Sequence, residues 1–187
     1  AEASLKRLHR DTIDALYLHG PSIAEIDAAL PALQALKAEG KVRAIGVCGE
    51  GAARDHAESS GFDAIMRVFN VINRGHARVF ARARSMSVQT VAIAPLAQGV
   101  LAPGELPVTP SGLWRLARAT LRGGPPAELV ARARAGLSGI DGFSQSAAAL
   151  AFVLQIGDVD LALTTTANAG CCGPPAGPTT PRWEGRT

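Results

Sequence analysis

Cysteines, aromatic residues and long apolar runs are all scarce in this sequence, and each shortage excludes a class of protein. The 187 residues include three cysteines, Cys48 and the adjacent pair Cys171 and Cys172. They show neither CxxC spacing nor grouping with histidine, so no metal site is predicted. An odd cysteine count without a disulfide framework is typical of a reducing compartment, and we expect a cytoplasmic protein. No apolar run reaches the roughly 18 residues of a membrane span, so no membrane partner is expected.

Positive charge is in slight excess, but it is not clustered. The formal net charge is +3, and arginines such as Arg78, Arg82 and Arg84 are scattered over helix-like segments. A nucleic-acid-binding surface would need basic residues grouped with aromatic ones, so no nucleic-acid partner is expected. Because aromatic residues make up only 4% of the chain, the core must be built largely from Ala, Leu and Val.

Short apolar runs alternate with longer helical segments, which predicts βα units and a parallel sheet. The expected strands cover residues 13–18, 44–47, 64–69, 91–94 and 161–164. The expected helices cover 31–40, with Pro31 as a first-turn proline, and then 52–60, 76–86, 113–121, 128–135 and 144–154. Residues 95–110 are rich in Pro and Gly and are interpreted as a long loop over the sheet edge.

One histidine stands where the first expected strand ends. The segment 11–20 reads Asp-Thr-Ile-Asp-Ala-Leu-Tyr-Leu-His-Gly, and Pro21 follows it, so a buried strand ends at His19 in a turn. In parallel α/β folds, ligands bind and catalytic side chains project where the strands end. His19 is therefore a candidate catalytic residue, and the alternative is a histidine paired within its loop.

The sequence around this histidine resembles the middle of an aldo-keto reductase. The resemblance is carried by Ser-Leu-Lys-Arg-Leu at 4–8, by 11–21, and by Leu-Gln-Ala-Leu-Lys-Ala-Glu-Gly-Lys-Val-Arg-Ala-Ile-Gly-Val at 33–47, and continues at 62–73, 94–101 and 146–166. It implies a (β/α)8 TIM barrel. Because a complete barrel needs about 250 residues, we expect a barrel truncated to about strands four to eight over residues 1–168. Prolines prevent a helix in 169–187, which is predicted to be a disordered tail.

The resemblance also implies a reaction, the NADPH-dependent reduction of an aldehyde or ketone. In that family a histidine orients the substrate carbonyl and a tyrosine donates the proton, and His19 matches the histidine. The family's tyrosine, lysine and aspartate belong to barrel units that would precede residue 1. Tyr17 is the sole tyrosine, and strand alternation puts it on the same face as His19, one layer deeper. It is either a substitute acid or an aromatic core residue.

Ten positions match the family's cofactor contacts, although several carry a different residue. They are Cys48, Gly49, Met66, Ile93, Ala94, Leu96, Ala97, Gly99, Thr165 and Thr166. Cys48 and Gly49 replace a Ser-Asn pair, Met66 replaces a glutamine and Ile93 replaces an aromatic residue that stacks on the nicotinamide. The loop from Ala94 to Gly99 keeps the family's pattern along the cofactor diphosphate, and the two threonines match the start of the phosphate-binding turn.

Other interpretations stay open at this point. The changed cofactor positions favour a non-catalytic binding or regulatory protein, or an inactive fragment, on the same scaffold. The glycines at 46, 49 and 51 could form a dinucleotide cradle, but their order differs from GxGxxG, and a tight turn explains them better. An open sheet of flavodoxin type would show the same alternation. Five strands cannot close an eight-strand barrel, so we also expect self-association through exposed sheet edges.

Overall fold

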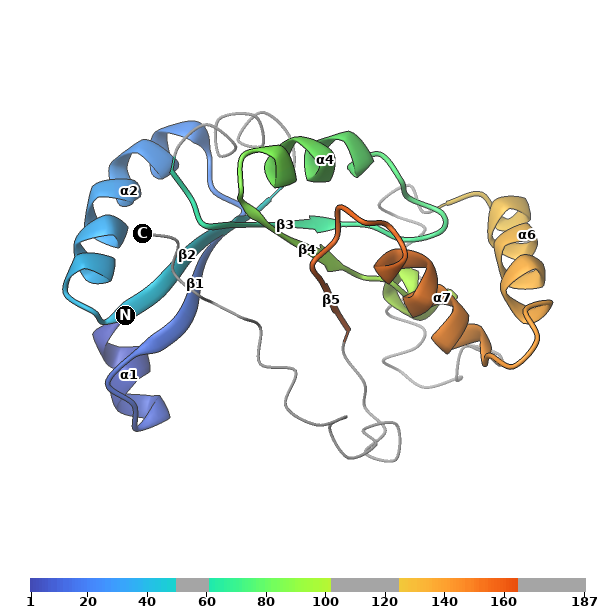
Figure 1. Cartoon of the computed structure of the whole chain (residues 1–187), viewed down its shortest axis with the longest axis horizontal. Coiled ribbons are helices and arrows are strands. Elements are labelled where there is room, and N and C mark those ends of the chain that lie inside the picture. The colour runs from blue at the N-terminus through green and yellow to red at the C-terminus, as the bar shows by residue number, and fades with distance from the viewer. Residues whose placement is uncertain (50–60, 102–124, 165–187) are drawn as a thin grey trace.

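A single parallel sheet organises the chain (Figure 1). The computed structural model describes residues 1–49, 61–101 and 125–164. The strands are paired in the order of the sequence, namely β1 (Ile13–His19), β2 (Val42–Cys48), β3 (Ala64–Val68), β4 (Gln89–Ile93) and β5 (Leu161–Leu163). All four neighbouring pairs are parallel, which confirms the predicted α/β fold with a parallel sheet.

Within the described residues, helices lie before β1 and in the β1–β2, β3–β4 and β4–β5 connections. They are α1 (Glu2–Leu8), α2 (Ile23–Ala38), α4 (Ala77–Ser85), α6 (Ala127–Ser138) and α7 (Gln145–Leu154), and a short 3-10 turn, η1 (Ala97–Gly99), follows β4. Figure 1 shows α2 and α4 over the same face of the sheet. The helices expected at 52–60 and 113–121 and the tail expected at 169–187 lie outside the described residues. Within the described ranges, no helix is both long and apolar enough to cross a membrane.

The start of α2 differs from the sequence-based expectation. The prediction that a helix begins at Pro31 is wrong, because Pro31 lies inside α2. The helix begins earlier with a capping box, in which the Ser22 hydroxyl accepts from the Glu25 N–H and the Glu25 carboxylate accepts from the Ser22 N–H at 2.7 Å. These hydrogen bonds from Ser22 lower the pKa of the Glu25 carboxyl. A signal of the form Ser-x-x-Glu thus marked the helix start better than the proline did.

The two faces of the sheet have different surroundings. One face carries Ile45, Val47, Ile65 and Ala92, which pack in one hydrophobic cluster with side chains from the helices. The helical members that are buried are Ile26, Leu33, Val79, Phe80, Ala83 and Val153. Burying large aliphatic side chains stabilises a fold by about 1.5–3 kcal/mol each, so this helix-covered face supplies most of the core. The opposite face carries Tyr17 and His19 with the small residues Gly46 and Ala64 in register.

Two aspartates fix the amino-terminal rim of the sheet in the same way. Asp63 directly precedes β3, and its carboxylate accepts the Ile45 N–H of β2 at 2.9 Å. The same carboxylate accepts a hydrogen bond from the Lys37 Nζ of α2 at 2.5 Å. Asp160 directly precedes β5, and its carboxylate accepts the Thr90 N–H of β4 at 2.8 Å and a guanidinium N–H of Arg84 of α4 at 3.0 Å. In both cases one carboxylate joins the preceding strand to the helix that leads into that strand. The arrangement sets the starting register of β3 and of β5.

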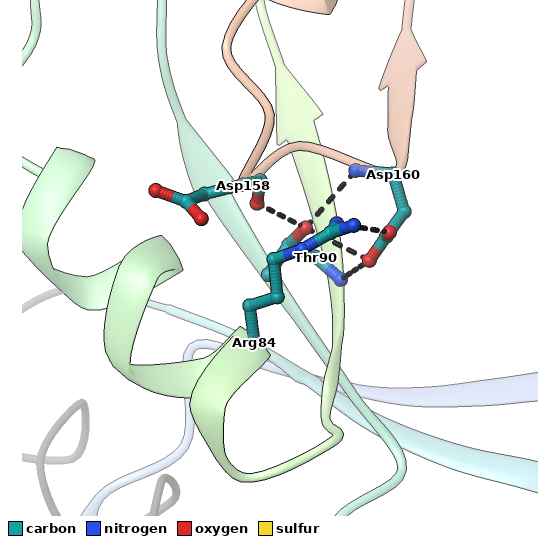
Figure 2. A network of polar contacts seen from close by, with 4 residues as sticks. All are labelled: Arg84, Thr90, Asp158 and Asp160. Atoms are coloured by element: carbon teal, nitrogen blue, oxygen red, sulfur yellow. Dashed lines mark hydrogen bonds and ion pairs between the residues drawn. The ribbon is translucent and has the colours of Figure 1, made fainter.

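The contacts around Asp160 are the denser of the two sets (Figure 2). Thr90 is fully buried, and its hydroxyl donates to the Asp158 carbonyl at 2.6 Å and lies 3.0 Å from the Asp160 carboxylate. The Asp160 N–H donates back to Thr90. Figure 2 shows that the Asp158 carboxylate points away from this network, so only the main chain of Asp158 takes part. The network holds the short edge strand β5 on β4.

Replacing Asp160 therefore tests whether its carboxylate stabilises the amino-terminal rim of the sheet. We expect Asp160→Ala to lower the free energy of unfolding by about 1–3 kcal/mol, because it leaves the buried Thr90 N–H without its acceptor. Asp158→Ala is the matched control and should change it by less than about 0.5 kcal/mol. Urea unfolding of the three proteins measures both effects. Equal losses in the two variants would contradict the assignment.

Candidate functional site

The carboxyl ends of the strands meet at one edge of the sheet, where the register aligns several predicted site residues. His19 pairs with Cys48, Cys48 pairs with Met66, and Met66 pairs with Val91. Because paired residues on parallel strands point to the same face, these side chains form one row on the face that carries Tyr17. Ile93 lies one layer further out, paired with Val68 and Leu163. The predicted grouping of His19, Cys48 and Met66 thus has a geometric basis.

His19 is exposed at the point where the chain leaves β1. Gly20 takes a left-handed conformation, with φ of 62°, and its N–H donates to the Cys48 carbonyl at 2.6 Å. Gly49 lies against this turn, since a Cβ added there would come 3.5 Å from the Gly20 Cα. The backbone around His19 is therefore tied to the end of β2. On its other side His19 borders a hollow lined by Gly20, Pro21 and the first turns of α2.

Tyr17 lies one layer below His19, with its ring over Gly46. A Cβ added at Gly46 would come only 2.3 Å from the Tyr17 Cε1, so the ring occupies the space that a side chain would fill. Burial, and secondarily the neighbouring Cys48 thiol, raise the pKa of the Tyr17 phenol above its usual 10.0. A phenol with a raised pKa keeps its proton at neutral pH. The ring thus forms part of the floor beneath the His19 row.

The loop after β4 has an unusual backbone. Ala94, Ala97 and Gln98 have φ of 52°, 48° and 59°, and Gly99 has φ of 94°. A left-handed conformation costs a residue with a Cβ about 1–2 kcal/mol. Hydrogen bonds within the loop offset part of this cost, since the Ala97 N–H donates to the Ala94 carbonyl and the Gly99 N–H to the Leu96 carbonyl, both at 2.9 Å. Residues held in such conformations cluster at functional sites.

Two carboxamides donate hydrogen bonds to this loop and were not among the site residues predicted from the sequence. The Asn70 Nδ2 donates to the Ala94 carbonyl at 3.0 Å, and the Gln145 Nε2 donates to the Leu101 carbonyl at 2.8 Å. Asn70 is 3% exposed and is the second residue after the end of β3 at Val68. An asparagine just past a buried strand was the signal available in the sequence. Gln145 carried no such signal beyond its place at the start of a helix.

Comparison with known proteins decides the family. The sequence model described as "Aldo/keto reductase family" matches residues 1–164. The chain belongs to the aldo/keto reductase family. The resemblance inferred from the sequence is thereby confirmed. No match to a curated protein was found.

Solved structures of aldo-keto reductases have the same fold as this family member. It aligns with aldo-keto reductase AKR11C1 from Bacillus halodurans at 24% identity and a TM-score of 0.71, over 89% of this chain and 55% of that one. Glycerol dehydrogenase AKR11B4 from Gluconobacter oxydans aligns at 25% identity and a TM-score of 0.65, over 86% of this chain and 52% of that one. An aldo-keto reductase from Klebsiella pneumoniae, solved with NADP and acetate, aligns at 21% identity and a TM-score of 0.61, over 91% of this chain and 54% of that one. The chain spans about half the length of these proteins.

The residues at this edge of the sheet differ in how well they suit a dinucleotide. The row of Cys48 and Met66 and the outer Ile93 offer apolar contact to a flat ring but no amide group. The loop bearing Ala94, Leu96, Ala97 and Gly99 lies at the same edge of the sheet. Its backbone is fixed by hydrogen bonds within the loop, and the small residues Ala94, Ala97 and Gly99 leave room for close approach of another molecule's phosphates. Thr165 and Thr166 lie outside the described residues. In the part of the chain that the structure describes, no group of three His, Cys, Asp or Glu side chains could hold a metal ion.

The packing of Tyr17 on Gly46 leads to a spectroscopic prediction for this family member. Tyr17 is the sole tyrosine, so the ultraviolet absorbance of tyrosinate reports on it alone. We expect it to titrate above 10.0 in the folded chain. We expect Gly46→Ala to lower this pKa toward that value by pushing the ring toward solvent. Because the folded pKa is raised, the stabilisation linked to this proton is full below about pH 10 and is lost as the pH rises through the folded pKa.

Gly136→Ala is the matched control for this experiment. A Cβ added at Gly136, inside α6, has nothing within 4 Å, so the titration should stay unchanged. A Tyr17 pKa that is the same in the unaltered chain and in Gly46→Ala would contradict the packing of the ring on the glycine.

Proposed function

We propose that this chain contributes the carbonyl-binding edge of an NADPH-dependent reductase of aldehydes or ketones. The observation that supports it most is the position of His19, exposed at the carboxyl end of β1 and in one row with Cys48 and Met66. Membership of the aldo/keto reductase family and the similarity to a protein solved with NADP support the cofactor. In this proposal residues 1–168 correspond to about strands four to eight of a barrel.

The proposed roles follow from the chemistry of each group. NADPH, when bound, supplies the hydride. A ring N–H of His19 donates a hydrogen bond to the carbonyl oxygen, which orients the substrate and stabilises the negative charge that develops on that oxygen. The side chains of Cys48, Met66 and Ile93 cover the flat ring by apolar contact. The backbone of the loop from Ala94 to Gly99 lies along the diphosphate.

A second candidate function is a binding protein on the same scaffold that does not turn over substrate. The observation in its favour is Tyr17, whose phenol is partly buried beneath the row and has a raised pKa. Such a phenol is poorly placed to donate a proton to a carbonyl bound at the level of His19. The absence of carboxamide groups at Cys48, Gly49, Met66 and Ile93 also points toward weaker or altered nicotinamide binding.

A pair of histidine variants separates the two candidates. We expect His19→Asn to lower kcat/KM for carbonyl reduction by about 10²-fold, because it weakens the donor to the developing oxyanion, and to leave the Kd for NADPH nearly unchanged. His9→Asn is the matched control, since His9 is a left-handed residue at the end of α1 and asparagine tolerates that conformation. Fluorescence titration with NADPH and an assay of its oxidation measure both quantities.

The outcomes of this test differ for each candidate. NADPH binding without turnover in the unaltered chain would favour the binding protein. If the unaltered chain neither binds NADPH nor turns over substrate, the proposed function is contradicted. Equal turnover in His19→Asn and the unaltered chain would exclude the role proposed for His19.

We also propose that the chain self-associates through its sheet edges. Within the described residues, the outer edges of β1 and β5 pair with no further strand. Leu161 and Leu163 on β5 are each 48% exposed. Unpaired edges with apolar side chains favour pairing with another chain.

A charge placed on β5 should weaken this association. We expect the unaltered chain to elute earlier from a size-exclusion column as its concentration rises, and Leu163→Lys to reduce that shift, since lysine protects sheet edges. Leu154→Lys changes a leucine of similar exposure, 53%, on α7 and should leave the shift unchanged. Elution that is independent of concentration in all three proteins would contradict the proposal.

A further inference from the structure

We propose that Asn70 and Gln145 are positioning residues that clamp the loop segment 94–101 at Ala94 and at Leu101 and thereby hold it ready for the cofactor. The inference rests on the proposed function, because it assigns a purpose to the geometry of the loop along the diphosphate. It concerns two side chains that lie outside the predicted site. Neither needs to touch the cofactor, since each acts through a loop carbonyl.

Asn70 holds the first end of the loop. The β3–β4 ladder ends with the Phe69 N–H donating to the Ile93 carbonyl at 3.1 Å. At the next residue the chain after β4 turns into the left-handed conformation, and the Ala94 carbonyl accepts from the Asn70 Nδ2 at 3.0 Å as well as from the Ala97 N–H at 2.9 Å. The Asn70 Oδ1 accepts the N–H groups of Ile72 and Asn73 at 3.0 and 2.8 Å, so its own loop fixes the carboxamide.

Gln145 holds the second end of the loop. Its Nε2 donates to the Leu101 carbonyl at 2.8 Å, and its Oε1 accepts from the Ser138 hydroxyl at 3.1 Å. The Leu101 side chain is fully buried in a small cluster with Leu137, Ala148 and Ala149. The helices α6 and α7 thus hold the end of the loop through one hydrogen bond and one apolar anchor.

The two contacts act on a segment that would otherwise relax. Ala94 itself, and Ala97 and Gln98 between the two clamped carbonyls, lie in left-handed conformations, and such conformations persist only when the surroundings impose them. A carbonyl can only accept, so an amide nitrogen suits both positions and a carboxylate at either would repel it. The carboxamides therefore set the loop's shape before any cofactor is present, which reduces the ordering that binding requires.

Aspartate and glutamate substitutions test the clamp with little change in size. Asn70→Asp keeps the acceptor for Ile72 and Asn73 but removes the donor to Ala94. Gln145→Glu does the same at Leu101, and a glutamate in the first turn of α7 does not disfavour the helix. Asn73→Asp is the matched control, because the Asn73 Oδ1 accepts the Gly75 N–H at 3.2 Å in an exposed turn of the same loop, and aspartate keeps that acceptor. The measurements are amide hydrogen exchange over 96–101, the Kd for NADPH, and the unfolding midpoint.

The clamp predicts a specific combination of results. Asn70→Asp and Gln145→Glu should each speed exchange at 96–101 more than in the rest of the sheet and raise the Kd for NADPH by about tenfold. Asn70→Asp should also lower the unfolding midpoint relative to Asn73→Asp, because it places a carboxylate at a buried position. Unchanged exchange, or faster exchange with unchanged NADPH affinity, would overturn the proposal. So would an equal increase of exchange across the whole sheet, which would indicate a general loss of stability. If the unaltered chain does not bind NADPH, the proposed function fails, and the exchange data alone decide whether the clamp exists.

Discussion

The register of the five parallel strands determines which side chains of this chain can meet. A shift of one residue in any strand would turn its side chains to the other face of the sheet. In the observed register His19, Cys48, Met66 and Val91 share one row. Asp63 and Asp160 act at the opposite rim, where each accepts a strand N–H and a basic side chain from a helix. The rim thus maintains the alignment on which the carboxyl edge depends.

The contributions to that alignment differ in strength. The ion pairs of Lys37 and Arg84 involve partly exposed side chains, and such pairs contribute about 0–1 kcal/mol. The hydrogen bonds to Thr90 are different, because the threonine is fully buried and an unmet donor there costs about 1–3 kcal/mol. The neutral and charge-assisted contacts to main-chain N–H groups therefore matter more for register than the ion pairs do.

Much of the architecture could be predicted from sequence, because it depends on local patterns. The apolar run ending at His19, the βα alternation and the glycine stops predict the strands and the parallel sheet. The start of α2 was mispredicted because the expectation rested on Pro31 alone, whereas the capping box of Ser22 and Glu25 begins the helix. The hydrogen bonds of Asn70 and Gln145 could not be predicted, because they join residues 24 and 44 positions apart in the sequence. The contact of Tyr17 with Gly46 also depends on register, which sequence pattern alone does not give.

The proposed function requires a dinucleotide to lie along the carboxyl edge of the sheet, over the His19 row and the loop 94–101. Amide hydrogen exchange of the unaltered chain, with and without saturating NADPH, tests it most directly. The account predicts slower exchange at residues 18–21 and 94–101 and no change at the amino-terminal rim around Asp63 and Asp160. Protection confined to that rim, or no protection anywhere, would contradict it.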